Sequence, residues 1–303
     1  MYARAVAAIS TALLGAAALL MPGSDARAGA HAHADSPVRA GGTGVRQLVI
    51  GHRGASAQAP ENTLAAIDRA AELGISWVEN DVQRTRDGEL VVIHDDSLQR
   101  TTDVKKVFPG RAPWKVKDFT ASEIARLDAG SWFGPRFTGT RVPTLKQYMR
   151  RVEHNRQKLV LEIKNPELYP GIEQQILKLL GNEGWLDRPH LTGRLIVQSF
   201  SADSLRIVHD LKPAVTTAFL GTPGVADLPG YAAFTDGINP SYGTISRGYV
   251  SAVHSVAGPH GRPLRVLAWT VDDADTARRV AGYGVDGVIS DKPDVVRDAL
   301  QTP

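Results

Sequence analysis

Acidic and basic side chains stand in this sequence where buried strands should be apolar. Residues 77–95 read WVENDVQRTRDGELVVIHD, two apolar-rich runs around an RDGE turn signal, which is the pattern of a β-hairpin. Glu79 and Asp81 fall within the first run, and His94 ends the second. A lone hairpin could place these groups on a solvent-facing surface, so their meaning depends on the charges elsewhere in the chain.

The turn predicts which hairpin side chains face each other. With residues 87–88 as a two-residue turn, the antiparallel ladder sets Asp81 opposite His94. Because strand side chains alternate between faces, Glu79 shares the face of Asp81. We therefore expect two carboxylates and one imidazole to be neighbours.

Two further strand ends carry charge. KLVLEIKNP places Glu162 and Lys164 on one face of a strand that should be buried on both faces, and His52 and Arg53 follow the apolar run before them. Charges at the carboxyl ends of parallel strands lie where a barrel keeps its active site. Taken singly, His52 could be a structural strand-end histidine.

The combined set suits metal-assisted cleavage of a phosphodiester. Three carboxylates favour a hard cation, Ca²⁺ or Mg²⁺, over zinc. An arginine and a lysine suit a phosphate, and two imidazoles suit a general acid and a general base. A metal could polarise the phosphoryl group while the imidazoles transfer protons.

The elements that must position these residues alternate between strand and helix, which predicts a parallel sheet. The hairpin connection is too short for a parallel crossover, so one of nine candidate strands pairs antiparallel and eight remain to close a (β/α)₈ TIM barrel. The candidate strands are 47–52, 77–82, 90–95, 158–164, 194–200, 214–220, 236–239, 264–271 and 286–290.

Helix start signals fill most gaps between the strands. Asn62 precedes an apolar-periodic run, and Thr120 with Glu123 and Thr144 with Gln147 have capping-box spacing. Residues 97–143 lack clear alternation and are too long for a plain connection. We expect a small excursion there, packed at the carboxyl-terminal mouth.

The first 28 residues predict export. Arg4 precedes an Ala/Leu-rich run, a Pro-Gly break and a small-x-small end at residues 26–28, which is typical of a secretory signal peptide. A membrane anchor is the alternative, but the run is slightly short and is followed at once by a cleavage-like site. We expect a signal peptide at 1–28, a disordered linker at 29–45 and one domain at 46–303, secreted or periplasmic, without a stable membrane span after cleavage.

Composition excludes other classes of protein. The chain has no cysteine, so a large hydrophobic core, with or without a bound metal, must stabilise it in place of disulfides. The net charge is +3 with acidic and basic residues interspersed, which leaves no electrostatic footprint for nucleic acid. We expect a small-molecule substrate.

The ordered motifs resemble those of the glycerophosphodiester phosphodiesterase family over about residues 47–298. The residues that carry the resemblance are HRG at 52–54, PENT at 60–63, the stretch 79–95 with RTT at 100–102, EIK at 162–164, QSF at 198–200, AWTVDD at 268–273 and GVDGVISDKPD at 284–294.

The resemblance implies a metal-dependent TIM barrel that hydrolyses glycerophosphodiesters to an alcohol and sn-glycerol 3-phosphate. By matching positions, the metal ligands are Glu79, Asp81 and Glu162, the acid/base pair is His52 and His94, Arg53 contacts the phosphate, and Lys164 and Trp269 line the mouth. Asn80 departs from the apolar or small residue that the family often has there, but alternation points it away from the cluster. Asp95, Asp96 and Gln198 lie near the mouth, where ladder geometry or helix capping explains them equally well.

Two rival functions use the same residues. A phospholipase D-like relative would cleave lysophospholipids, although those relatives depend on cysteine-bearing loops that this chain lacks. A non-catalytic phosphodiester-binding module would have no need of two proton-transfer groups. The attacking oxygen, water or the glycerol 2-hydroxyl, is left open.

Overall fold

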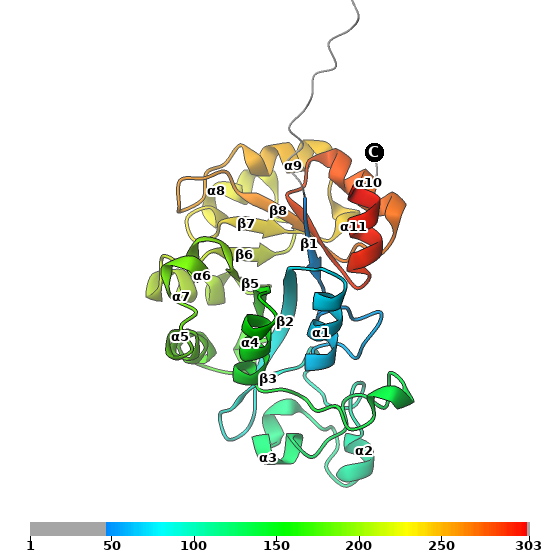
Figure 1. The fold of residues 1–303 in the computed structure, drawn as a ribbon. Helices are drawn as coiled ribbons and strands as arrows, with labels where there is room; N and C mark the ends of the chain where they lie inside the picture. The colour runs from blue at the N-terminus through cyan, green and yellow to red at the C-terminus, as the bar shows by residue number, and fades with distance from the viewer. Residues whose placement is uncertain (1–46, 302–303) are drawn as a thin grey trace, which may run out of the picture. The chain divides into compact units, whose positions relative to one another are not determined.

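Eight parallel strands close into a barrel in the part of the chain that the computed structural model describes, residues 47–301 (Figure 1). The sheet order is β1-β9-β8-β7-β6-β5-β4-β2, and pairing of β1 with β2 closes the ring, while β3 joins β2 antiparallel. The predicted TIM barrel is confirmed. The strands are β1 (Leu48–Gly51), β2 (Trp77–Arg84), β3 (Leu90–Val92), β4 (Lys158–Ile163), β5 (Leu195–Ser199), β6 (Thr217–Leu220), β7 (Gly237–Asn239), β8 (Arg265–Ala268) and β9 (Gly287–Ser290).

Helices follow the strands around the outside of the ring, except α2 and α3, which belong to residues 97–143 (Figure 1). They are α1 (Leu64–Glu72), α2 (Val104–Val107), α3 (Ala121–Ile124), α4 (Leu145–His154), α5 (Ile172–Asn182), α6 (Arg188–Gly193), α7 (Ala202–Leu211), α8 (Leu228–Tyr231), α9 (Arg247–His254), α10 (Ala274–Tyr283) and α11 (Pro293–Gln301). Within residues 47–301, none of them has the length and apolar character needed to cross a membrane. The predicted signal peptide (1–28) and linker (29–45) lie outside the described residues.

The helix caps agree with the sequence in two places and differ in a third. Both predicted capping boxes are present, at the starts of α3 and α4. The cap of α1 is Thr63, whose hydroxyl accepts from the Ala66 N–H. Asn62 is therefore one residue too early to be the cap, and its side chain is available to the barrel mouth.

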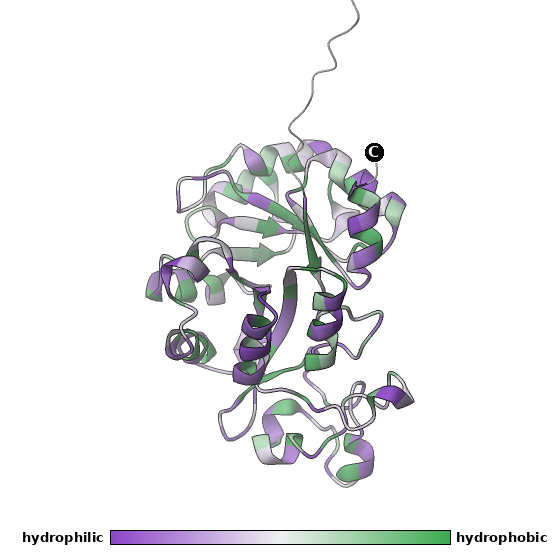
Figure 2. Cartoon of the chain, in the orientation of Figure 1, coloured by the Kyte–Doolittle hydropathy of each residue, from purple (hydrophilic) through white to green (hydrophobic). Residues whose placement is uncertain are grey.

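Apolar side chains form separate layers inside and outside the barrel. Ile50, Val160 and Ile289 belong to a cluster in the interior, and two larger clusters fill the space between strands and helices. Figure 2 accordingly shows β6 and β7 predominantly hydrophobic and α4 with a hydrophilic face toward the viewer. The polar groups at the carboxyl ends of the strands stand on this packed support.

The hairpin register differs by one residue from the prediction. Val82 lies opposite Val92, so Asp81 lies opposite Ile93, whose N–H donates to the Asp81 carbonyl at 2.9 Å. The cause is a three-residue loop, 86–88, ending at a glycine with φ 91° and closed by the Thr85 N–H donating to the Glu89 carbonyl. The expected cross-strand pair of Asp81 with His94 is thus wrong.

Residues 97–143 form the expected excursion, with a small core of its own. Leu98, Phe119 and Leu127 are fully buried and pack with Val91 and Ile93 of the hairpin. In Figure 1, α2 and α3 gather beyond β3 at the lower edge of the view. The hairpin thus joins the excursion to the barrel.

Candidate active site at the carboxyl ends of the strands

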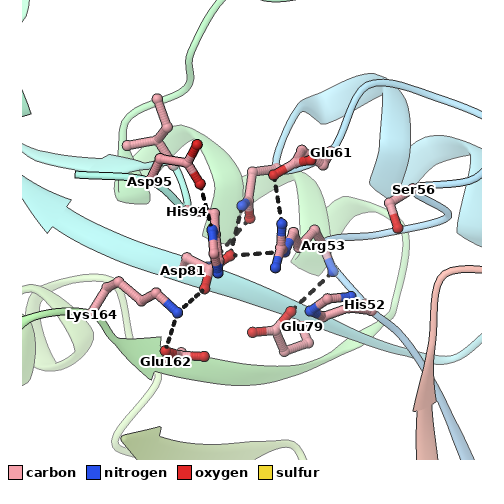
Figure 3. A network of polar contacts seen from close by, with 12 residues as sticks. His52, Arg53, Ser56, Glu61, Glu79, Asp81, His94, Asp95, Glu162 and Lys164 are labelled. Atoms are coloured by element: carbon pink, nitrogen blue, oxygen red, sulfur yellow. Dashed lines mark hydrogen bonds and ion pairs between the residues drawn. The ribbon is translucent and has the colours of Figure 1, made fainter. Parts of the chain in front are cut away.

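The turn after β1 sets the first side of the site. Arg53 has a left-handed backbone, φ 54°, which is uncommon for a residue with a side chain. Its N–H donates to Glu79 Oε2 at 3.0 Å, and its guanidinium donates to Glu61 at 2.7 Å and lies 3.4 Å from Asp81. The strained turn is therefore held by contacts that also aim the guanidinium at the acidic residues (Figure 3).

The three predicted metal ligands converge on one point. Parallel pairing of β2 with β4 sets Asp81 beside Glu162, and strand alternation puts Glu79 on the same inner face. One carboxylate oxygen from each residue lies within 4.8 Å of the others, and all three side chains are buried. Such a cluster of oxygen ligands could hold a metal ion.

Electrostatics in the cluster favours a bound cation. Burial, and then the charges of Asp81 and Glu162, raises the pKa of Glu79 well above its usual value. Burial, and then the charge of Asp81, raises the pKa of Glu162 to about 8. Burial acts in the same direction on Asp81, but Arg53 and Lys164 outweigh it and lower its pKa to about 2.

One oxygen of the cluster also accepts no hydrogen bond. Asp81 Oδ1 is buried without a hydrogen bond from any residue in 47–301, whereas Oδ2 accepts from Asn62 at 2.8 Å. The Lys164 ammonium lies 3.6 Å from this oxygen, too far for a hydrogen bond, and a buried carboxylate oxygen without one is costly unless a cation binds it directly. The residues present therefore fit a divalent metal.

Each predicted catalytic histidine is fixed by an aspartate. His52 Nδ1 donates to Asp291 at 2.6 Å, and His94 Nδ1 donates to Asp95 at 2.7 Å. In both rings Nε2 has no hydrogen-bond partner within the described residues. Both histidines line a cavity of about 100 Å³ that also contains Glu79 and Glu162.

His94 reaches this cavity because the chain turns directly after the hairpin. The Gln83 side-chain amide donates to the carbonyls of Ile93, His94 and Asp95, at 3.0, 3.0 and 2.6 Å. These hydrogen bonds bend the backbone of residues 93–95 around the buried Gln83 side chain. Gln83 therefore positions His94, the role that the predicted cross-strand pair was expected to fill.

Lys164 and Trp269 line the same cavity. The Lys164 ammonium lies 2.9 Å from Glu162 and 3.6 Å from Asp81. Trp269 donates from its indole to the Asn239 carbonyl at 2.8 Å and meets the Phe200 ring edge to face. The cavity thus has a charged wall and an apolar wall.

Several side chains that the sequence reasoning did not assign support the site. Arg100 donates to both Glu61 and Asp95, and Ser56 donates to Asp291. Three of them stand inside quoted motifs: Glu61 in PENT, Arg100 in RTT and Asp291 in SDKPD. Their position inside the quoted motifs was the available signal.

Gln198, Asp96 and Asn80, for which the sequence predicted no role, have different surroundings in the structure. Gln198 donates to Glu79 at 3.4 Å and accepts from Asn239, so it belongs to the site wall. Asp96 pairs with Lys115 in the excursion. Asn80 is fully buried, is absent from the cavity lining, and its amide has no partner within residues 47–301.

Comparison with known proteins agrees with this geometry. Residues 52–295 match the model of the Glycerophosphoryl diester phosphodiesterase family. A glycerophosphodiester phosphodiesterase of Caldanaerobacter subterraneus is 36% identical over 256 residues, covering 83% of this chain and 97% of the relative. One of Bacillus subtilis is 33% identical over 264 residues, covering 82% and 85% respectively.

Solved structures show the same likeness. An Oleispira antarctica phosphodiesterase in complex with the product sn-glycerol-3-phosphate has a TM-score of 0.72 and 30% identity, covering 84% of this chain and 97% of that one. A glycerophosphodiester phosphodiesterase from Agrobacterium tumefaciens has a TM-score of 0.64 and 27% identity, covering 83% and 99%. The chain therefore belongs to the glycerophosphoryl diester phosphodiesterase family and is an enzyme of that class.

Proposed function

We propose that the protein hydrolyses glycerophosphodiesters to an alcohol and sn-glycerol 3-phosphate. The observation that carries this proposal is the pair of aspartate-held histidines on one cavity with Glu79 and Glu162, two members of the cluster of three buried carboxylates. The Oleispira relative, solved with sn-glycerol-3-phosphate, supports the same chemistry. A binding module would gain nothing from two imidazoles with free Nε2 atoms.

The proton transfers fall to His52 and His94. One Nε2 takes the proton of the attacking oxygen, and the other donates a proton to the leaving alkoxide. Asp291 and Asp95 keep the hydrogen on Nδ1, so each ring presents Nε2 to the substrate. The attacking oxygen is that of water or of the glycerol 2-hydroxyl, and a cyclic phosphate detected by ³¹P NMR during a single turnover would identify the second route.

The cations and the apolar wall bind the substrate. Arg53 and Lys164 contact the phosphate and balance its charge, and Trp269 bounds the cavity on the apolar side. Glu79, Asp81 and Glu162 would hold one divalent cation, Ca²⁺ or Mg²⁺. Such an ion supplies positive charge that stabilises the phosphoryl oxygens during cleavage.

The protein acts outside the cytoplasm under this proposal. The support is the signal-peptide pattern of residues 1–28, ending in a small-x-small site. Sequencing the amino terminus of the protein recovered from the periplasm or medium should find it processed near residue 28. An unprocessed chain retained in the cytoplasm would contradict export.

A substrate panel with matched variants tests the activity. Glycerophosphocholine and glycerophosphoethanolamine should release sn-glycerol 3-phosphate with Ca²⁺ or Mg²⁺ present, and a chelator should stop it. Lysophosphatidylcholine should turn over more slowly, because the cavity beside the histidines is small. Binding of these diesters without product release would leave only a binding module.

Metal binding has a readout that is independent of activity. Ca²⁺ or Mg²⁺ should raise the melting temperature of the wild-type protein, because a ligand that binds only the folded state stabilises it. In Asp81→Asn this increase should be lost, whereas Asp96→Asn, whose side chain pairs with Lys115 away from the cluster, should retain it. An unchanged increase in Asp81→Asn would remove Asp81 from the ligand set.

A further inference from the structure

The amino-terminal end of the barrel, opposite the proposed active site, is hollowed. A cavity of about 670 Å³ opens there, against about 100 Å³ at the mouth between the histidines. Its position follows from its lining, which includes the first residue of five strands and residues just before two others: Leu48, Trp77, Lys158, Leu195 and Arg265, with Thr216 and Asp236. We call this cavity the cationic hollow.

The charges around the cationic hollow are unbalanced. Lys158, Arg188, Arg262 and Arg265 line it, and none of them pairs with a carboxylate within residues 47–301. Its single acidic residue, Asp236, is already engaged by His260 at 2.6 Å and by the Thr217 N–H at 3.1 Å. A concave surface lined by one sign of charge concentrates ligands of the opposite sign.

The floor of the cationic hollow is apolar. Half-buried Leu48 and Leu191 and exposed Pro263 supply its accessible apolar surface, while Trp77 and Ile196 are each about 94% buried. A free phosphate would use only the rim, and a neutral lipid would use only the floor. The volume lies in the range that single small ligands occupy in proteins.

We propose that the cationic hollow binds an anionic amphiphile, a single apolar chain with a carboxylate or phosphate head. The head lies among the arginines and the chain lies against Leu48 and Leu191. The preceding segment of the same chain is a poor occupant, since residues 29–46, which remain after the proposed signal cleavage, contain two arginines and one aspartate and thus share the sign of the rim. This site is separate from the proposed hydrolysis and does not depend on it.

Calorimetric titration of the purified protein tests the proposal, with probes kept below their micelle concentrations. Dodecanoate and dodecyl phosphate should bind, and added salt should weaken binding because the rim is exposed. Inorganic phosphate, which lacks the chain, and dodecyl maltoside, which lacks the charge, should bind at least about tenfold more weakly. If dodecanoate binds and dodecyl phosphate does not, the head is a carboxylate, and the reverse result identifies a phosphate.

Matched double variants locate the binding. Arg262→Gln with Arg265→Gln should weaken dodecanoate binding about tenfold or more, with hydrolysis of glycerophosphocholine unchanged. The control, Arg247→Gln with Arg278→Gln, removes the same charge from exposed helices α9 and α10 and should bind as the wild type does. Equal binding by both double variants, displacement of the amphiphile by sn-glycerol 3-phosphate, or no heat with either amphiphile would overturn the proposal.

Discussion

The two histidines of the site have the same partner type but different supports. His52 follows β1 and bonds to Asp291, which follows β9, a neighbouring strand of the barrel. His94 bonds to the adjacent residue, Asp95, which is held by Arg100 from the excursion. The first half of the site is therefore built by closure of the barrel, and the second by a surface network of charges.

We expect the His52 half of the site to be rigid and the His94 half to be adjustable. The His52 side chain is 17% exposed and the His94 side chain 29%. Ion pairs near water contribute less to stability than packed strands do, because solvent screens them. We infer that changes in the excursion tune the His94 half while leaving the His52 half intact.

The largest expected effect comes from the histidines themselves. His52→Ala and His94→Ala should each lower kcat for glycerophosphocholine by roughly 10²- to 10⁴-fold, the usual contribution of a general acid or base. His260→Ala, at the opposite end of the barrel, is the control and should keep full activity. Retained activity in either site variant, with the fold verified by circular dichroism, would disprove the acid/base assignment.

The aspartates should show the next effect. Asp291→Asn and Asp95→Asn each replace a charged acceptor, and a hydrogen bond to a charged group contributes about 1.5–3 kcal/mol, or roughly 10- to 100-fold in kcat/KM. If either aspartate only fills space, its asparagine variant should be nearly as active as the wild type. Similar losses in both would show that the two supports orient their rings equally well.

The pH profile tells which role His94 has. Burial lowers the pKa of His94, while the charge of Asp81 and the hydrogen bond to Asp95 raise it. Removing the Asp95 charge withdraws stabilisation from the imidazolium, so the limb of the kcat/KM profile that belongs to His94 should move to lower pH in Asp95→Asn. Movement of the acid limb identifies a general base and movement of the basic limb a general acid, whereas two fixed limbs would contradict the assignment.

The sequence predicts the barrel half of the site better than the excursion half. Charges such as Glu79 and Glu162 interrupt runs that are otherwise apolar, and this contrast reveals them. Arg100 and Glu61 stand in loops where charge is ordinary, so their pairing depends on tertiary contacts that no local pattern encodes. The fold was predictable from the sequence because the alternation of strands and helices is visible in the local periodicity of apolar residues.

The register of the hairpin could not be predicted from the sequence. Glycine at position 88 suits a two-residue turn and also the left-handed end of a three-residue loop. The choice is made by side-chain contacts: the Thr85 hydroxyl accepts from the Glu89 N–H and donates to Asp87. One added loop residue moves every pair along the ladder, and Asp81 meets Ile93 in place of His94.

Arg100 should affect only the His94 half, with a smaller loss. Its side chain is 44% exposed, so we expect Arg100→Gln to lower kcat/KM by roughly two- to tenfold, in line with partly screened ion pairs. The effect should nearly vanish in the Asp95→Asn background, because the same path is already broken. Arg278→Gln, with a side chain 53% exposed, is the control. A full additional loss in the double variant would mean that Arg100 acts elsewhere, for example through Glu61 on Arg53.

The smallest expected effect lies in the hairpin turn. An alanine at Gly88 meets no atom within 4 Å, so its cost comes from the backbone, where φ 91° is unfavourable for a residue with a Cβ. We expect Gly88→Ala to lower the free energy of unfolding by about 1–2 kcal/mol in urea titrations. Gly110→Ala, which also has free space but no positive φ, should be close to neutral. Since Gln83 and not the turn fixes the backbone at His94, kcat of the folded Gly88→Ala enzyme should stay near that of the wild type. A large fall in kcat would mean that the loop controls the position of His94, and it would weaken the distinction between the two supports.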